Sequence, residues 1–188
     1  RNEAAAAEVS GGTPLQCDGR DREAVVEAAD SVVADHGRID FLVNNASISS
    51  NAYFAMHDPA DWERVMRTNI DGCYHWSRAV VRPMMIEQSG AILNLASVSG
   101  LAGVAGQTAY STSKGAILAL SRALAAEVGA KGIRVNALAP GLVDTDMTAV
   151  IPRRIRHGYT DRILMKRFGK PEEIAQAALF LVSDAASY

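Results

Sequence analysis

The chain is organised around the stretch Gln107-Thr108-Ala109-Tyr110-Ser111-Thr112-Ser113-Lys114-Gly115, where a long helical pattern begins. Tyr110 and Lys114 are four residues apart, so on a helix they share a face and the ammonium lies close to the phenol. A phenol has a reference pKa of about 10, and a cation about 5 Å away at an effective dielectric of about 20 favours the phenolate by roughly 3 kcal/mol. The pair therefore indicates a general acid–base site, although amphipathic helices also carry such pairs by chance.

Short apolar runs alternate with helical patterns along the rest of the chain. The apolar runs predict buried strands at 39–44, 91–96 and 133–138. Helical periodicity predicts helices at 21–36, 59–85, 108–129 and 171–183. Strands that alternate with helices indicate an α/β fold, with a parallel sheet covered on both faces. No interdomain linker is visible, so we interpret residues 1–188 as a single domain.

Polar or turn-forming residues follow each predicted strand. Asn44, Ser97 and Pro140-Gly141 stand at or just beyond the carboxyl ends of the three apolar runs. Ligands of open parallel sheets bind beyond these carboxyl ends. The sequence therefore places Ser97 at the same edge of the sheet as a ligand site.

The composition is that of an ordinary globular protein, with 48% hydrophobic residues among 188. A formal net charge of −2 gives no electrostatic case for binding nucleic acid or an anionic membrane. No apolar stretch approaches the roughly 18 residues of a membrane span. The two cysteines, Cys17 and Cys73, and four scattered histidines suggest no disulfide framework and no metal site, which favours a cytoplasmic protein.

Four further motifs accompany the Tyr110 and Lys114 pair, each in a consistent order along the chain. They are Asn44-Asn45-Ala46-Ser47, Thr68-Asn69-Ile70-Asp71-Gly72, Asn94-Leu95-Ala96-Ser97 and Asn136-Ala137-Leu138-Ala139-Pro140-Gly141. This set resembles the short-chain dehydrogenase/reductase family, and most of all its 3-oxoacyl-(acyl carrier protein) reductases and polyketide ketoreductases. The resemblance covers nearly the whole chain and implies a Rossmann-like, doubly wound parallel sheet.

The resemblance also implies parts that this sequence does not show. The family holds its dinucleotide on a strand, a Gly-rich turn and a helix N-terminus, and no such unit precedes the first matched motif. Family members also continue into another strand after the last helix. We therefore expect an interior portion of a longer protein, with a sheet that is incomplete at both ends.

The resemblance assigns roles to four residues. Tyr110 would donate a proton to the substrate carbonyl oxygen, and Ser97 would hydrogen-bond the same oxygen. Lys114 would lower the Tyr110 pKa and bind the nicotinamide ribose, and Asn69 would hold a water that links Lys114 to solvent. Ser97 and Asn69 could equally be caps or turn formers.

The same resemblance identifies cofactor contacts, which are Arg1, Asp18, Asn44, Ala46, Tyr110, Lys114, Pro140, Gly141 and Thr145. Asp18 would lie near the adenine, and Thr145 near the nicotinamide carboxamide or phosphate. Many NADP-dependent relatives carry a basic residue at the position of Arg1, where a guanidinium suits the ribose 2′-phosphate. This favours NADP (NADPH) over NAD.

The expected activity is reduction of a ketone by NADPH, on a small-molecule or carrier-protein-bound 3-oxoacyl thioester. The alternatives are an NAD-dependent alcohol, polyol or sugar dehydrogenase, and a catalytically silent dinucleotide-binding partner. Residues 146–169 mix apolar and basic side chains and are interpreted as a substrate lid. The resemblance further implies a homo-oligomer, dimer or tetramer, that pairs through the helices at 59–85 and 108–129. Carrier-linked relatives dock their partner through two basic positions, which here are Lys131 and the uncharged Gln88.

Overall fold

A computed structural model describes residues 11–188, so Arg1 lies outside the described part. The described chain forms a three-stranded parallel sheet in the order β1 (Phe41–Asn44), β2 (Gly90–Leu95) and β3 (Ile133–Leu138). These strands confirm the three predicted apolar runs. The register pairs Asn44 with Asn94, so β1 and β2 end level with each other at the carboxyl edge.

Helices connect the strands and continue beyond them. The α-helices are α2 (Arg22–His36), α3 (Pro59–Met66), α4 (Gly72–Glu87), α5 (Ser99–Ala102), α6 (Thr108–Val128), α7 (Asp146–Ala149), α8 (Arg153–Arg162) and α9 (Pro171–Val182). Short 3-10 turns are η1 (Phe54–Met56), η3 (Gly129–Lys131) and η4 (Asp184–Ala186), and η2 (Arg67–Asp71) is a π-helical turn.

Local residues account for several of the helix ends. The Asp21 side chain caps α2 by accepting hydrogen bonds from the backbone N–H groups of residues 23 and 24. Gly37 ends α2 in the left-handed conformation, with φ of 80°, which glycine adopts without a steric penalty. Pro59 and Pro171 lie in the first turns of α3 and α9, where no N–H partner is lost.

The predicted helix at 59–85 differs from the structure in one respect. It is two α-helices, α3 and α4, joined by the π-helical turn η2. The wider turn holds Asn69, whose buried amide bonds both backbone groups of Ile48. We attribute the irregular turn to these hydrogen bonds, which helical periodicity cannot reveal.

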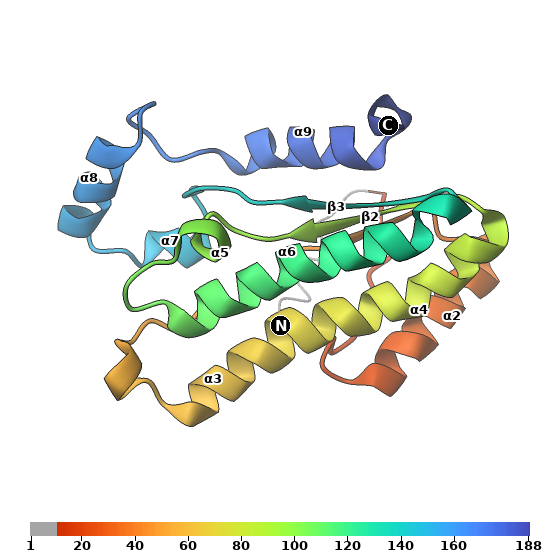
Figure 1. Cartoon of the computed structure of the whole chain (residues 1–188), viewed down its shortest axis with the longest axis horizontal. Helices are drawn as coiled ribbons and strands as arrows, with labels where there is room; N and C mark the ends of the chain where they lie inside the picture. The colour runs from red at the N-terminus through yellow and green to blue at the C-terminus, as the bar shows by residue number, and fades with distance from the viewer. Residues whose placement is uncertain (1–10) are drawn as a thin grey trace.

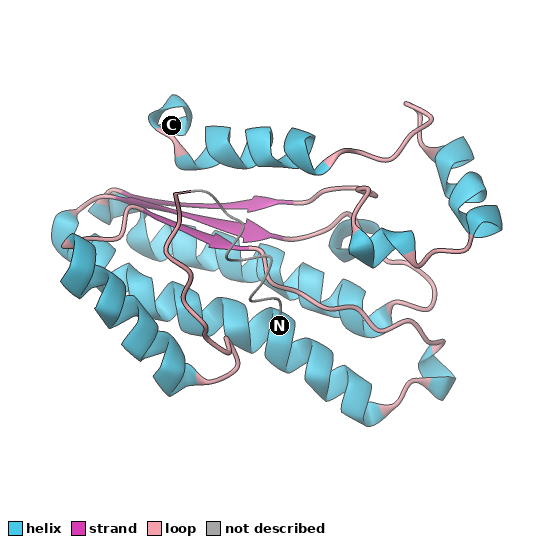
Figure 2. Ribbon diagram, turned by 180° about the vertical axis from the view of Figure 1, so that it is seen from behind, coloured by secondary structure: helices cyan, strands magenta, loops and turns pink. Residues whose placement is uncertain are grey.

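The sheet lies between two helical layers (Figure 1). Helices α2, α4 and α6 lie on one side, whereas α9 packs against β2 and β3 from the other. Figure 2 shows the same sandwich from behind, with the strands between the two layers. This arrangement confirms the Rossmann-like parallel α/β fold. On β1 the α9 side is open, since Phe41 and Val43 are 56% and 46% exposed.

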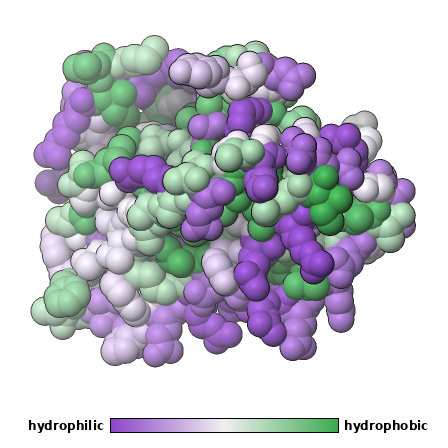
Figure 3. Space-filling model, turned by 45° about the vertical axis from the view of Figure 1, so that its right-hand side comes forward, coloured by the Kyte–Doolittle hydropathy of each residue, from purple (hydrophilic) through white to green (hydrophobic). Residues whose placement is uncertain are grey.

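The main core lies between the sheet and the α4–α6 layer. It consists of Val80, Met84, Ile92, Val128, Ile133 and Val135. Full burial of such a side chain contributes roughly 1.5–3 kcal/mol, so this cluster is a major source of stability. Hydrophobic side chains also reach the surface in several patches, as the face in Figure 3 shows. Within the described residues, no helix combines the length and apolar character needed to cross a membrane.

Helix α5 rests directly on the backbone of α6. A Cβ atom added at Gly100 would lie 2.6 Å from the carbonyl carbon of Lys114 and 2.7 Å from the nitrogen of Gly115. Both distances are well below van der Waals contact, so only glycine permits this approach. Because α5 begins two residues after Ser97, the contact fixes the Ser97 turn against α6.

We predict that Gly100→Ala destabilises the fold by about 1–3 kcal/mol, because the new methyl group must push α5 away from α6. The measurement is the free energy of unfolding in urea. Gly129→Ala is the matched control, since a Cβ atom there meets nothing within 4 Å. Equal free energies of unfolding of the two variants would show that α5 can move away from α6 without loss of stability.

Candidate active site

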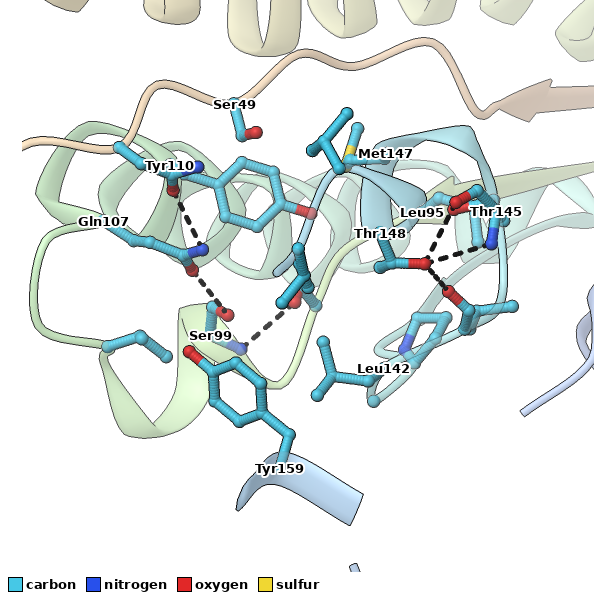
Figure 4. A pocket seen from close by; sticks show the side chains of 18 of the residues that line it. Ser49, Leu95, Ser99, Gln107, Tyr110, Leu142, Thr145, Met147, Thr148 and Tyr159 are labelled. Carbon is cyan, nitrogen blue, oxygen red and sulfur yellow. Dashed lines mark hydrogen bonds between the residues drawn. The ribbon is translucent and has the colours of Figure 1, made fainter. Parts of the chain in front are cut away.

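A cavity of about 900 Å³ opens at the carboxyl edge of the sheet, and two of the four predicted catalytic residues, Ser97 and Tyr110, border it (Figure 4 labels Tyr110). Ser97 comes from the turn after β2, and Tyr110 comes from the first turns of α6. Pro140, Gly141 and Thr145, which follow β3, line the same cavity. The structure therefore brings five of the predicted site residues together from three segments.

Ser97 and Tyr110 face each other in this cavity. Ser97 is buried, and its Oγ accepts a hydrogen bond of 3.1 Å from the Ser99 backbone N–H. Burial raises the pKa of Tyr110, and a hydrogen bond with Ser97 partly opposes this rise. A raised pKa keeps the phenol protonated at neutral pH, which suits a proton donor.

Lys114 lies beneath these groups and is almost inaccessible, with 2% of its surface exposed. Its Nζ donates a 2.6 Å hydrogen bond to the Leu95 carbonyl oxygen and lies 5.6 Å from the centre of the Tyr110 ring. Burial lowers the Lys114 pKa to about 8, although the nearby Cys73 acts in the opposite direction. The Lys114 ammonium therefore loses its proton more readily than that of an exposed lysine.

The expected lowering of the Tyr110 pKa by Lys114 is not what the structure shows. The Tyr110 pKa is raised by burial, and Ser97 is the group that opposes the rise. The physical reason is the burial of the phenol, which disfavours its charged form. Spacing places the two side chains on one face of α6 but does not determine where the ammonium points.

Asn69 connects the loop after β1 to α6 through side-chain hydrogen bonds. Its Oδ1 accepts from the Ile48 N–H, and its Nδ2 donates to the Ile48 carbonyl and to Ser113 Oγ, each at 2.9 Å. Ser113 Oγ in turn donates to the Tyr110 carbonyl at 2.8 Å. Asn69 therefore positions the helix turn that carries Tyr110, while its role in holding a water stays a prediction.

The other predicted cofactor residues lie in different surroundings. The Asn44 side chain points into the layer between β1 and α4 and donates to Ser77 Oγ at 3.1 Å. Ala46 is exposed in the turn that follows β1. Asp18 pairs with Arg20 at 2.6 Å and borders a separate hollow of about 480 Å³. The structure does not bring Asp18 into the cavity of Ser97 and Tyr110.

The predicted lid region borders the cavity through α7, α8 and the residues between them. Its cavity-lining side chains are Met147, Thr148, Val150, Ile151, Pro152, Ile155 and Tyr159. Arg156 holds α8 by pairing with Asp144 at 2.9 Å and by stacking 4.1 Å from the centre of the Phe168 ring. The role of this segment as a substrate lid stays a prediction.

The two carrier-docking positions lie away from the cavity. Gln88 follows α4 and precedes β2, and Lys131 lies two residues before the start of β3, so both are near the amino ends of strands. The cavity is at the carboxyl ends. A carrier bound to Gln88 and Lys131 would therefore not lie over the cavity of the same chain.

Several polar residues of the cavity wall were not predicted from the sequence, notably Asn51, Ser99, Gln107 and Tyr159. Gln107 could have been predicted from the sequence, because it precedes Tyr110 by three positions and so lies about one helical turn away. Asn51 and Tyr159 are remote in the chain from Tyr110. Only the fold brings them to the cavity.

Comparisons with known proteins show which proteins the chain is similar to. A family model described as Enoyl-(Acyl carrier protein) reductase matches residues 1–188. The chain is 42% identical over 168 residues to the 3-oxoacyl-[acyl-carrier-protein] reductase FabG of Thermotoga maritima, covering 89% of this chain and 68% of that protein. It is 38% identical to the acetoacetyl-CoA reductase of Synechocystis, covering 89% of this chain and 70% of the relative.

The comparison with solved structures finds the same fold. A crystal structure of NAD+-bound xylitol dehydrogenase superposes with a TM-score of 0.86 at 34% identity, covering 92% of this chain and 73% of that one. The chain spans 63% of the next curated relative, a FabG of Chlamydia trachomatis, and thus about two thirds of the length of such proteins.

Because Lys114 is buried, the stability of the folded protein depends on pH. The Lys114 pKa falls from its usual 10.5 to about 8 on folding. Below pH 8 both folded and unfolded chains are protonated, and the fold carries the full cost of the buried charge. Between about pH 8 and 10.5 only the unfolded chain stays protonated, so this cost is progressively lost and stability rises with pH.

We therefore predict that Lys114→Met is more stable than the unsubstituted protein at pH 7, by about 1–3 kcal/mol, and that this advantage shrinks towards pH 10. Urea unfolding at pH 7 and pH 9.5 measures the difference. Lys131→Met, at an exposed site, is the control that removes a lysine without removing a buried charge. A stability difference that is the same at both pH values would refute the buried-charge account.

Proposed function

Since this chain belongs to the short-chain dehydrogenase/reductase family, whose members bind a nicotinamide dinucleotide, we propose that it reduces a ketone to a secondary alcohol with NADPH. The proposed substrate is a 3-oxoacyl thioester, free or carried by a protein. The observation that carries the proposal is the pairing of Ser97 with Tyr110 at the wall of the cavity, above Lys114.

The chemistry follows from the positions of these side chains. The dinucleotide, when bound, supplies a hydride to the carbonyl carbon. Tyr110, protonated because burial raises its pKa, gives its proton to the carbonyl oxygen, so that hydride and proton together make the alcohol. Ser97 Oγ accepts a hydrogen bond from the Ser99 N–H, and its own O–H, which contacts Tyr110 in this structure, would turn to the substrate oxygen and stabilise the developing oxyanion.

The residues around the cavity fit a nicotinamide at the strand ends. Pro140, Gly141 and Thr145 line the side that follows β3, and a Cβ atom at Gly141 would meet nothing within 4 Å, so the wall there is open. Lys114, with its Nζ 5.6 Å from the centre of the Tyr110 ring, would bind the ribose and, through the ribose hydroxyls, return a proton to the phenol. Asn44 and Ala46 would border the dinucleotide along the turn after β1.

The lining of the cavity favours an acyl substrate over a polyol. Most of its side chains beyond Tyr110 are apolar, including Val104, Leu142, Met147, Ile151 and Ile155. A polyol would leave hydroxyl groups without hydrogen-bond partners against such a wall, whereas an acyl chain gains from the burial of its methylene groups. The names of the curated relatives, 3-oxoacyl and acetoacetyl reductases, support the same choice.

The second candidate is an NAD-dependent polyol dehydrogenase, which the NAD+-bound xylitol dehydrogenase structure favours. Our preference for NADPH rests on Arg1, outside the described residues, and on the resemblance to reductases that use it. Turnover of an acetoacetyl thioester with NADPH and with NADH, beside oxidation of xylitol with NAD+, separates the two candidates.

We further propose a cytoplasmic homo-oligomer, dimer or tetramer, that pairs through α3–α4 and α6. Exposed side chains of α6 support this contact, with Ala119 and Ala123 one turn apart on one face. Leu120 and Leu124, by contrast, already pack against core clusters of the same chain. Small exposed alanines allow two α6 helices to approach closely.

We predict that Tyr110→Phe in the full-length protein lowers kcat for ketone reduction by more than tenfold and leaves the Kd for NADPH nearly unchanged. The ring stays and only the transferable proton is lost, and a tenfold loss corresponds to about 1.4 kcal/mol of transition-state stabilisation. Steady-state kinetics and calorimetry give the two readouts. Tyr74→Phe, at an exposed tyrosine, is the control. Retention of more than a tenth of kcat would remove Tyr110 from the role of acid.

We also predict that Ala123→Arg shifts the protein to a smaller oligomer, because it places two like charges and a large side chain in the pairing contact. Sedimentation velocity at micromolar concentration measures the change. Ala130→Arg, an exposed alanine beyond the end of α6, is the control. An unsubstituted protein that sediments as a monomer would contradict the proposed assembly.

A further inference from the structure

The segment 153–170, which borders the cavity through α8, is strongly basic. It contains seven arginines and lysines and a single aspartate, whereas the chain as a whole has a net charge of −2. Positive charge is therefore concentrated beside the cavity, where the roles of Ser97 and Tyr110 do not require it. A concentration of one sign of charge attracts a ligand group of the opposite sign.

Only part of this charge is neutralised within the chain. Arg156 pairs with Asp144 at 2.9 Å, and Arg167 pairs with Glu173 at 2.6 Å. In the described part of the chain, three exposed arginines of α8 make no side-chain hydrogen bond or ion pair, and these are Arg153, Arg154 and Arg162. Their guanidinium groups are available to a ligand.

Of these three arginines, Arg162 lies on the cavity side of α8. Ile155 and Tyr159 line the cavity, and Figure 4 shows Tyr159 projecting from α8. Arg162 follows Tyr159 by three positions and Ile155 by seven, which at about 3.6 residues per turn places all three on one face. Arg153 precedes Arg162 by nine positions, or about two and a half turns, so it lies on the opposite side of the helix.

Arg162 is also at the far end of α8 from the lining residues that follow α7. It is the last residue of the helix, about 4.5 Å along the axis beyond Tyr159, and it does not itself line the cavity. Arg162 therefore stands just outside the cavity. A substrate group that it binds would be remote from the reacting carbon.

We propose that Arg162 forms an anion subsite, which binds the phosphate at the end of the pantetheine arm of a thioester substrate. This assignment rests on the proposed reduction of a 3-oxoacyl thioester and adds to it the part that carries the acyl group. A guanidinium matches the geometry of phosphate oxygens and can donate two hydrogen bonds to them. Coenzyme A and acyl carrier proteins, which the names of two relatives mention, share this phosphorylated arm.

The exposure of Arg162 suits the charged end of the arm rather than the acyl chain. The acyl chain gains from burial against the apolar lining, whereas a phosphate would pay a desolvation cost there. At an exposed arginine the phosphate keeps much of its hydration, and the ion pair contributes modestly to binding. The contact therefore affects KM rather than kcat.

The test uses the full-length protein with NADPH and two substrates that differ by one phosphate, acetoacetyl-pantetheine and acetoacetyl-4′-phosphopantetheine. For Arg162→Gln we expect KM for the phosphorylated substrate to rise about threefold to tenfold, with kcat changed by less than about twofold. KM for acetoacetyl-pantetheine is expected to stay within about twofold. Arg153→Gln removes the same charge from the opposite side of α8 and is the matched control, with both KM values unchanged.

Calorimetry with 4′-phosphopantetheine alone supplies a readout that does not depend on turnover. We expect Arg162→Gln to raise its Kd by about the same factor as KM, and Arg153→Gln to leave it unchanged. Binding to the unsubstituted protein is expected to weaken as ionic strength rises, because salt screens an exposed ion pair.

The outcomes separate the subsite from the proposed function. If Arg162→Gln raises both KM values equally or neither, or if Arg153→Gln has the same effect, there is no phosphate subsite at Arg162. A loss confined to acetoacetyl-CoA would place the contact on the nucleotide phosphates and overturn the assignment to the arm. An unsubstituted protein that reduces neither thioester contradicts the proposed function, whereas binding of 4′-phosphopantetheine that depends on Arg162 would still support the subsite.

Discussion

The close contact between Gly100 and the backbone of α6 is the constraint on which the site depends. It allows α5 to rest on Lys114 and Gly115 without an intervening side chain. Because Ser97 lies two residues before the start of α5, the contact holds the Ser97 hydroxyl at Tyr110, the residue one turn before Lys114. A chain that lacked this contact could keep the same three residues and still fail to bring them together.

A buried amide sets the position of α6 along the sheet. Asn94 in β2 is fully buried, and its Nδ2 donates to Ser121 Oγ on α6 at 2.9 Å while its Oδ1 accepts from Asn44 Nδ2 on β1 at 2.8 Å. Removal of one partner would leave a buried polar group unsatisfied, at a cost of roughly 1–3 kcal/mol. Such bonds help to offset the cost of burying the Lys114 ammonium, which the fold carries in order to place a cation under Tyr110.

The strands and helices could be predicted from the sequence because apolar runs and helical periods report burial directly. The edge that carries the site could also be predicted, since Ser97 and Pro140 both follow parallel strands. The direction of the Lys114 ammonium could not, because it depends on the Leu95 carbonyl, a backbone group with no sequence signal. The pairing of Gln107 with Asn51 joins residues 56 positions apart, so only the folded chain reveals it.

We propose that the carboxyl edge of the sheet holds a ketone between Ser97 and Tyr110. A crystal structure of the full-length protein with NADP+ and a 3-oxoacyl thioester tests this most directly, through the distances from the ketone oxygen to Ser97 Oγ and Tyr110 Oη. We expect both distances to fall within hydrogen-bond range, about 2.5–3.2 Å. A thioester bound in the cavity with its ketone oxygen beyond the reach of both hydroxyls would contradict the account.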